Sequence, residues 1–335
     1  MKERKEKKKT PAWKIVLRIL AGLLGAVVLF LLVMFTIPLT ETGDRTPVEG
    51  SADWMARLDD ETSLAAVVLP GTHDSATRYV QLGYFSKCQA FGIGDQLRAG
   101  YRYLDIRLAV AGEKRQLMHG FTKCRVGAMP WTDTLTLDAV LADCYRFLAE
   151  HPTETVLFAV KQERGAESVA QFQAVLDGYV QLEPDRWLLT DEIPTLGEAR
   201  GKLVLLRRYD DEAGLGVRAG IPLIWEDQRG FEDASLDIAE EPNGSYTLRV
   251  QDRFEYETEE KWAAFIAGME KAPVGEGDVA IHFLSTKGHA TFGHPFRYAK
   301  ELDARLTGRD ALAGWIVVDF ASAPLAEHIY SRNFD

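Results

Sequence analysis

The stretch RYLDIRL, residues 102–108, has the pattern of a β-strand that carries charges on one face. Successive side chains of a strand point to opposite faces, so Asp105 and Arg107 lie on the same side. A charge inside a protein is costly unless it is paired. This strand therefore predicts a sheet whose interior holds a polar site.

Seven other short apolar runs have the residue types of strands. They are AAVVL (65–69), RQLMH (115–119), TVLFAVK (155–161), KLVLLRR (202–208), YTLRVQ (246–251), VAIHFL (279–284) and GWIVVDF (314–320). Longer segments between them, such as 135–152 and 166–180, have the apolar spacing of helices. Eight strands separated mostly by helices favour an α/β fold, a closed (β/α)8 barrel of the TIM type. The second and third strands follow each other closely, so we expect the barrel to be irregular.

The N-terminus carries a long apolar segment behind a basic one. Residues 19–37 contain no charged residue, and a helix of this length covers roughly 28 Å, close to the hydrocarbon thickness of a bilayer. We expect an uncleaved signal anchor with a cytoplasmic N-terminus, because Lys and Arg precede it and no small-x-small cleavage site follows. A cleaved signal peptide is the alternative. The predicted parts are a basic tail (1–14), a transmembrane helix (15–38), a linker (39–51) and one extracellular barrel domain (52–335).

The charge of the chain is distributed unevenly. Residues 1–38 carry a net charge of +6 and the whole chain carries −11, which leaves −17 for residues 39–335. A domain this acidic would repel a phosphate backbone, so we expect no nucleic-acid partner. No obligate protein partner is evident either.

The three cysteines, Cys88, Cys124 and Cys144, are too few for a disulfide-stapled scaffold. One bridge with a free thiol and three unpaired thiols are both compatible with the sequence. No pair has metal-ligand spacing, so a zinc site is not expected.

Polar residues gather at the predicted C-terminal ends of the strands, where barrel enzymes place their active sites. They are His73, Asp74, Asp105, Arg107, His119, Lys161, Glu163, Arg207, Arg208, Asp252 and Asp319. A salt-bridge network that closes the barrel mouth could account for any one of them. Their common position favours a functional site for the set.

Two histidines that face an arginine are typical of in-line displacement at phosphorus. One imidazole takes a proton from the attacking hydroxyl, and the other gives a proton to the leaving oxygen. A guanidinium neutralises the phosphate and stabilises the charge of the transition state. A carboxylate is needed to fix the tautomer of the basic imidazole. Asp319 is the candidate, because strand eight neighbours strand one in a closed barrel.

Four segments resemble motifs of the phosphatidylinositol-specific phospholipase C family in its bacterial single-domain form. They are LPGTHDSAT (69–77), QLRAGYRYLDIRLA (96–109), LMHGF (117–121) and ETVLFAVKQE (154–163). The resemblance covers roughly residues 52–325 and is strongest in the first half. It implies a distorted (β/α)8 barrel that acts on a phosphatidylinositol-like lipid in a membrane. The implied reaction cleaves the glycerol–phosphate bond and gives diacylglycerol and inositol 1,2-cyclic phosphate.

The resemblance also implies roles for six catalytic residues. His73 resembles the general base that deprotonates the inositol 2-hydroxyl, and His119 resembles the general acid for the diacylglycerol oxygen. The other matches are Arg107 for the phosphate, Asp74 coupled to the acid, Asp105 beside them and Asp319 orienting the base.

Four further positions match residues that contact the inositol ring. Lys161, Arg208 and Asp252 resemble groups that bind its hydroxyls. Phe254 stands where bacterial relatives have a tyrosine that stacks under the sugar, and Gln162 stands where a second lysine is expected. Both departures concern headgroup specificity more than catalysis.

The resemblance also bears on metal use. The eukaryotic branch of the family holds a calcium ion near the phosphate, and here Arg107 occupies the corresponding position. A fixed guanidinium replaces the metal charge and would repel a cation. We therefore expect no metal site, no calcium requirement and no cofactor.

An acidic domain should not adhere to anionic lipid by charge alone. Four aromatic residues in loops after the first and third strands are candidates for insertion into lipid: Tyr84, Phe85, Phe91 and Trp131. The anchor itself raises the local concentration of the domain near lipid.

Two other functions remain open from the sequence. Glycerophosphodiester phosphodiesterases share the barrel and two histidines, but they need a divalent metal held by a Glu-x-Asp pair and lack a central arginine. A membrane-tethered protein that binds inositol lipid without turnover is the second alternative. The sequence does not distinguish a free, glycosylated or GPI-type headgroup. For the Gly-rich segment 285–296, with His289 and His294, a mobile loop at the barrel mouth is favoured over a metal site.

Overall fold

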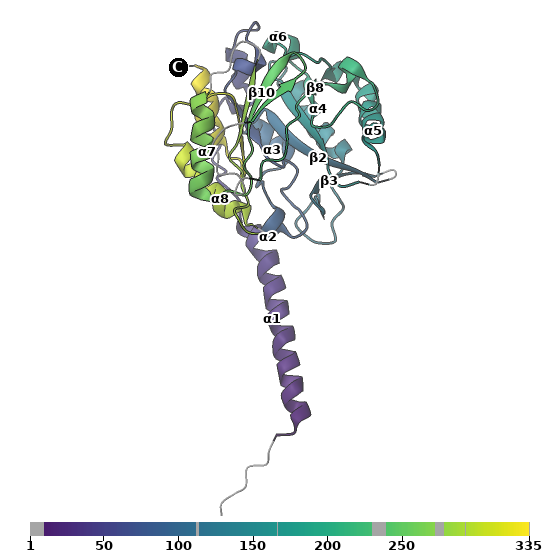
Figure 1. Cartoon of the computed structure of the whole chain (residues 1–335), viewed down its shortest axis with the longest axis vertical. Coiled ribbons are helices and arrows are strands. Elements are labelled where there is room, and N and C mark those ends of the chain that lie inside the picture. Colours follow the sequence, from purple (N-terminus) through teal and green to yellow (C-terminus); the bar gives the residue numbers. More distant parts are fainter. Residues whose placement is uncertain are drawn as a thin grey trace, which may run out of the picture.

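The computed structural model describes residues 10–111, 114–165, 167–229, 239–271, 278–291 and 293–334. A long helix, α1 (Ala12–Thr40), projects from a folded unit of strands and helices (Figure 1). Most of the basic N-terminal tail, residues 1–9, lies outside the described residues.

The sheet consists mainly of parallel strands. These are β1 (Leu69–Thr72), β2 (Tyr103–Ala111), β5 (Val156–Gln162), β6 (Trp187–Leu188), β7 (Leu203–Arg207), β8 (Ile221–Pro222), β10 (Tyr246–Gln251), β11 (Val279–Phe283) and β12 (Trp315–Val318). They pair in the order β10–β11–β12–β1–β2–β5–β7, and the short strands β6 and β8 both pair with β7. Three antiparallel strands extend this sheet: β3 (Lys114–His119), β4 (Thr122–Lys123) and β9 (Ala239–Asn243).

The predicted irregular barrel is confirmed, and its irregularity has a defined place. Among the described residues, no strand pairing joins β8 to β9 or β10, so the barrel is open along one seam. Side chains bridge the seam instead. Asn243 accepts a hydrogen bond from the Ile224 amide at 2.7 Å and donates one to the Ile224 carbonyl at 3.1 Å. The Tyr246 hydroxyl donates to the Pro222 carbonyl.

Helices cover the outside of the barrel (Figure 1). After α1 they are α2 (Gly83–Ser86), α3 (Ile93–Arg98), α4 (Leu137–Glu150), α5 (Val169–Leu182), α6 (Leu196–Ala199), α7 (Thr258–Lys271), α8 (Pro295–Leu306) and α9 (Ala323–Tyr330). In α4 the buried residues recur at three- and four-residue spacing, as the sequence predicts: Leu137, Val140, Leu141, Cys144, Phe147 and Leu148. A capping box of Ser168 and Gln171 begins α5.

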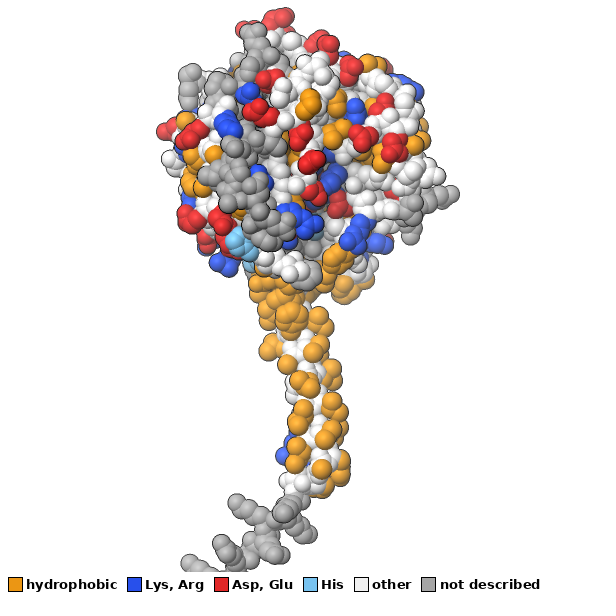
Figure 2. Space-filling view, viewed as in Figure 1, with side chains coloured by type: hydrophobic (Ala, Val, Ile, Leu, Met, Phe, Trp, Pro, Cys, Tyr) orange, Lys and Arg blue, Asp and Glu red, His pale blue; other side chains and the backbone are white. Residues whose placement is uncertain are grey.

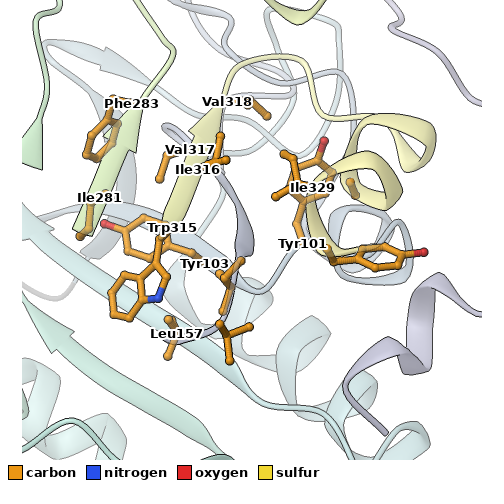
Figure 3. Packing of buried hydrophobic residues seen from close by; sticks show 14 of the residues in the cluster. Tyr101, Tyr103, Leu157, Ile281, Phe283, Trp315, Ile316, Val317, Val318 and Ile329 are labelled. Atoms are coloured by element: carbon orange, nitrogen blue, oxygen red, sulfur yellow. The ribbon is translucent and has the colours of Figure 1, made fainter. Parts of the chain in front are cut away.

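Side chains of β2 alternate between the barrel interior and the outer layer. Tyr103 belongs to the interior cluster with Leu157, Ile281 and Trp315 (Figure 3). Its neighbour Leu104 belongs to a second cluster, under α4 and α5. By the same alternation, the side chains of Asp105 and Arg107 point to the barrel interior, like that of Tyr103. The apolar interior cluster thus forms the floor on which those charges lie.

Two of the predicted strands differ from the structure. The run 65–69 is mostly not a strand, because Leu64–Ala66 forms a 3₁₀ helix and β1 begins only at Leu69. Pro70 and Gly71 therefore lie inside β1 and do not form a turn that ends it. Pro70 is tolerated because β2 begins opposite Gly71.

The third predicted strand runs in the opposite direction to the barrel strands. β3 pairs antiparallel with β2, with Leu108 opposite Leu117, so the two strands form a hairpin. The strand therefore adds no parallel member to the barrel. The two-residue strands β6 and β8, which the sequence pattern did not predict, both pair with β7 and together occupy the eighth parallel position.

The helix α1 stands clear of the barrel along most of its length (Figure 2). One 18-residue window has a mean hydropathy of 2.8 and none of it is buried, so the helix is long and apolar enough to cross a membrane. A signal sequence near an N-terminus passes the same test.

The C-terminal end of α1 is attached to the barrel by polar contacts. The Lys87 ammonium donates to the carbonyls of Pro38 and Glu41, both at 2.6 Å. Nε2 of His294 lies 2.9 Å from the buried carboxylate of Glu41, and its ring stacks on Tyr84 with centroids 4.0 Å apart. Part of the segment 285–296 is thus bound to the helix end through His294.

Candidate active site

The pairing of β1 with β12 places His73 beside Asp319. Thr72 is opposite Val318 in parallel register, so the next residue of each strand lies at the same edge of the barrel. The His73 amide donates to the Val318 carbonyl at 2.9 Å. Nδ1 of His73 then lies 2.8 Å from Oδ1 of Asp319. This contact assigns the ring proton to Nδ1 and leaves Nε2 as the acceptor.

Asp74 turns back beneath His73 because its backbone is left-handed, with φ of +43°. This conformation is uncommon outside glycine, although aspartate and asparagine tolerate it better than most residues. The Asp74 amide donates to the Asp105 carboxylate at 3.1 Å, which fixes the turn. The Asp74 side chain is 2 % exposed and contacts Nδ1 of His119. It also lies 3.3 Å from Nε of Arg107.

The β2–β3 hairpin returns His119 to the barrel mouth. Leu108 and Leu117 are opposite each other, so the end of β3 lies close to the level of Arg107 on β2. His119 is therefore placed by an antiparallel strand, although the sequence pattern indicated a barrel strand. Its Nε2 stays free to face the cavity because Nδ1 contacts Asp74.

Arg107 lies at the centre of the site. Its Nε lies 3.2 Å from Asp105 and its Nη2 lies 2.9 Å from Nε2 of His73. Burial disfavours the charged guanidinium, but the carboxylates of Asp105 and Asp74 outweigh burial and raise the pKa of Arg107 well above its usual value. The side chain is 16 % exposed, so a fixed positive charge faces the cavity.

The electrostatic environment of His73 has opposing parts. Burial lowers the pKa of this imidazole, but the charge and hydrogen bond of Asp319 together with the charge of Asp74 outweigh burial, and the net shift is upward. The Arg107 charge acts in the opposite direction. For Asp74, burial would raise the pKa, but Arg107 and His119 hold it well below its usual range. Asp74 is thus ionised at neutral pH.

The structure brings all ten predicted site residues to one end of the barrel. A cavity of about 360 Å³ is lined by eight of them: His73, Arg107, His119, Lys161, Arg208, Asp252, Phe254 and Asp319. The other two, Asp74 and Asp105, lie beneath the cavity and hold the groups that line it.

Lys161 and Arg208 form the cationic wall of this cavity. Burial, together with Arg107 and Arg208, lowers the pKa of Lys161. No described residue makes a hydrogen bond to its ammonium, so the group is available to a ligand. Arg208 lies 3.5 Å from the Asp105 carboxylate. Both cations are therefore held close to Arg107.

Two residues of the site were missed or underestimated in the sequence. The Trp225 ring lies 3.7 Å from the Arg208 guanidinium, and its Nε1 donates to Asp252 at 3.2 Å. Trp225 follows the two-residue strand β8, which has too little pattern to be recognised. Glu163, which the sequence placed at a strand end without a role, accepts the Gly120 amide at 2.9 Å next to His119.

One group in the described part of the chain has the composition of a metal site. His73, Asp74 and Cys88 offer ligand atoms that lie within 4.8 Å of one another. Nη2 of Arg107 lies 2.9 Å from the nitrogen of His73 that faces the cavity, so a cation there would meet a guanidinium. Burial raises the pKa of the Cys88 thiol well above its usual value, which also disfavours a thiolate ligand. All three cysteines are free and buried.

Comparisons with known proteins match this geometry to one family. Residues 72–209 match the family model "Phosphatidylinositol-specific phospholipase C, X domain". A 1-phosphatidylinositol phosphodiesterase of Staphylococcus aureus is 26 % identical over 291 residues, covering 80 % of this chain and 88 % of the relative. One from Listeria monocytogenes is 29 % identical over 229 residues, covering 60 % and 68 %.

Solved structures show the same fold. A phosphatidylinositol-specific phospholipase C variant from Staphylococcus aureus has a TM-score of 0.70 at 22 % identity and covers 84 % of this chain and 98 % of its own. The Listeria monocytogenes enzyme has a TM-score of 0.62 at 20 % identity, with coverage of 84 % and 98 %. Residues 72–209 are thus similar to the X domain of the phosphatidylinositol-specific phospholipase C family, and the similarity to bacterial members extends over most of the chain.

Proposed function

We propose that the protein is a membrane-anchored phospholipase C that cleaves the glycerol–phosphate bond of phosphatidylinositol or a glycosylated form of it. The observation that carries this proposal is the placement of His73 and His119 on either side of Arg107 in one cavity. The relatives named 1-phosphatidylinositol phosphodiesterase support the substrate class.

His73 is the general base of this reaction. Its Nδ1–H is directed to Asp319, so Nε2 accepts the proton of the inositol 2-hydroxyl. The deprotonated oxygen attacks phosphorus and forms the ring of the 1,2-cyclic phosphate. An upward-shifted pKa makes His73 a stronger base than an ordinary imidazole.

His119 is the general acid. Asp74 holds its Nδ1, so Nε2 gives a proton to the glycerol oxygen as the phosphorus–oxygen bond breaks. The products are diacylglycerol and inositol 1,2-cyclic phosphate. One proton leaves the inositol hydroxyl and one joins diacylglycerol, so the reaction consumes no water and no co-reactant.

Arg107 supplies the positive charge at the phosphate. The ion pairs to Asp74 and Asp105 fix the guanidinium before substrate enters, and Arg107 lines the cavity beside His73. A preorganised cation stabilises charge on the phosphate oxygens without reorganisation during the reaction. The same charge disfavours a divalent cation at this point, so the reaction proceeds without metal.

The opposite wall recognises the inositol ring. Lys161, Arg208 and Asp252 offer donors and an acceptor to the ring hydroxyls, and Phe254 offers an apolar face. Trp225 holds the Arg208 and Asp252 side chains in place. Phenylalanine lacks a hydroxyl at position 254, so stacking is its whole contribution to binding.

The helix α1 anchors the enzyme in the membrane that holds its substrate, with the N-terminus in the cytoplasm and the barrel outside. Trp131 is 78 % exposed and Phe121, which lines the cavity, is 56 % exposed; both lie between β3 and α4 in the chain. They can enter lipid. Phe91, an earlier candidate for this role, is only 7 % exposed and packs in the core, which excludes it.

The test places the full chain in detergent-free vesicles of phosphatidylinositol, with EDTA in the buffer. The release of diacylglycerol is then measured. The wild-type protein and the control His151→Ala are expected to release it, because His151 pairs with Asp53 far from the cavity. His73→Ala and His119→Ala are each expected to lower the rate about 10²-fold or more. Lipid binding without release, or activity that requires added metal, would contradict the proposal.

A further inference from the structure

A second cavity, of about 290 Å³, lies where α1 meets the barrel. One wall is the last part of α1, including Leu31, Phe35 and Leu39. The other walls are the segment 78–83 and the loop 125–130. Figure 2 shows that the hydrophobic surface of α1 continues onto the base of the barrel at this level. The cavity is therefore built partly from the anchor and partly from the enzyme.

The charges that line this cavity are all positive. Arg78, Lys87 and Arg125 line it, and no described acidic residue does. The chain as a whole has a net charge of −11. A local excess of cations on an acidic protein, beside an apolar wall, fits an amphipathic anion.

These cations are only partly neutralised by the protein. Nη1 of Arg125 donates to the Thr132 carbonyl at 2.6 Å, and no described carboxylate lies within ion-pair distance of Arg125. Lys87 donates to two carbonyl oxygens, and burial lowers its pKa to about 8, with Arg78 and Arg45 adding to the shift against Glu41. Arg78 has one carboxylate, Asp95, at 3.5 Å.

The apolar wall indicates which anion fits. Leu31 is 57 % exposed and Phe35 is 37 % exposed, and both belong to the C-terminal half of a helix long enough to cross a bilayer. The end of such a helix lies at the level of the lipid headgroups, where phosphate and the upper acyl chain occur together. A soluble anion has no apolar part that could pack against Leu31 and Phe35.

We infer that this cavity binds one anionic phospholipid of the membrane that α1 crosses. Arg78, Lys87 and Arg125 hold its phosphate, and an acyl chain lies along Leu31 and Phe35. This site is separate from the catalytic cavity and holds α1 against the barrel. The inference rests on the proposed anchor, because without a membrane-embedded α1 the cavity lacks a wall.

Leu82 lies between the two cavities and lines both of them. It is 56 % exposed and has a φ of +52°, an unfavourable conformation for a branched apolar residue in water. An exposed leucine between two lipid sites gains contacts on both sides. Its strained position at the start of α2 is explained by this arrangement.

The experiment places the full chain in nanodiscs of phosphatidylcholine with a minority of phosphatidylglycerol and identifies retained lipid by native mass spectrometry. We expect one retained phosphatidylglycerol on the wild-type chain. Arg78→Gln with Arg125→Gln is expected to lower its retention roughly tenfold or more, because two of the three cations that attract the phosphate are removed. The matched control, Arg186→Gln with Arg218→Gln, removes two cations elsewhere and is expected to retain the lipid.

Ala128→Trp tests the cavity volume with the cations intact, since residue 128 lines the cavity. It is expected to lower retention as well. Two results would overturn the site but not the anchor. One is equal retention of phosphatidylcholine, and the other is unchanged retention after the Arg78 and Arg125 substitutions on a chain of full mass. A mass that lacks α1 would overturn the anchor and the site together, while the catalytic proposal would be unaffected.

Discussion

Oδ1 of Asp319 lies 2.8 Å from Nδ1 of His73, although 246 residues separate the two along the chain. The contact follows from the parallel pairing of β1 with β12, which brings the C-terminal ends of the first and last strands together. It fixes the imidazole tautomer and raises the pKa of His73 against the effect of burial. Much of the proposed chemistry depends on this one contact.

Replacing Asp319 with Asn is expected to weaken the base. Without the carboxylate, burial and Arg107 both lower the pKa of His73, and the charge of Asp74 alone opposes them. The base acts in its neutral form, so the acidic limb of the kcat/KM profile should move to lower pH. The plateau rate should fall about 10²-fold, since the amide can hold the wrong tautomer. The pH profile of diacylglycerol release measures both effects.

The exposed carboxylate of Asp310 provides a matched control, because it pairs with Arg332 at the surface. Asp310→Asn should leave the pH profile unchanged. An acidic limb that stays in place in Asp319→Asn would show that His73 is not the group that titrates.

Replacing Arg107 with Lys is expected to reduce kcat by roughly 10²-fold or more, with the fold intact. A lysine keeps the charge but loses the planar fork that contacts Asp74, Asp105 and the cavity at the same time. Steady-state kinetics in EDTA measure the effect. A variant with wild-type kcat would remove Arg107 from the transition state.

The buried ion pair of Arg102 and Glu154 is expected to stabilise the fold without taking part in the reaction. Both side chains are 0 % exposed, and their atoms lie 2.7 Å apart. Glu154→Gln leaves a buried guanidinium without its counter-charge, which should lower the free energy of unfolding by about 3 kcal/mol. Urea denaturation measures this. An unfolding free energy equal to that of the wild type would show that the pair is replaceable.

The contact between Glu41 and His294 is expected to stabilise the junction in a pH-dependent way. Burial lowers the pKa of His294, but Glu41 and the Tyr84 carbonyl raise it, and the net shift is upward. A raised pKa contributes stability that is complete below the unfolded value and disappears as pH rises through the folded value. Glu41→Gln should therefore lower Tm by about 2 °C near pH 6 and by much less near pH 9.

Thermal unfolding of the full chain in nanodiscs at both pH values checks this prediction. His289→Ala serves as the control, because His289 pairs with Glu260 on α7 at the surface. A loss of Tm in Glu41→Gln that is the same at both pH values would exclude His294 as the titrating partner.

The sequence predicts that these residues lie together because strand ends meet at one edge of a barrel. His73, Arg107 and Asp319 each lie at or just beyond the C-terminal end of an apolar run, and parallel pairing brings such ends together whatever lies between them. The two-residue spacing of Asp105 and Arg107 in RYLDIRL also predicts the interior position of Asp105 correctly. These features depend only on strand periodicity.

Other features depend on tertiary contacts that periodicity does not report. The start of β1 at Leu69 is set by its pairing with β12 and β2, so the apolar run before it was assigned wrongly to the strand. The antiparallel direction of β3 depends on a hairpin, and a run of alternating residues has no direction. Trp225 belongs to the site only because the barrel seam brings its segment close to Arg208.

The most direct test of the account is the identity of the first phosphorus-containing product. Phosphorus NMR of phosphatidylinositol vesicles with the full chain and EDTA should show a cyclic phosphodiester that forms before any acyclic phosphate and is absent with His73→Ala. A first product that is an acyclic inositol phosphate would contradict attack by the inositol hydroxyl, and phosphocholine release from phosphatidylcholine would contradict the assigned substrate.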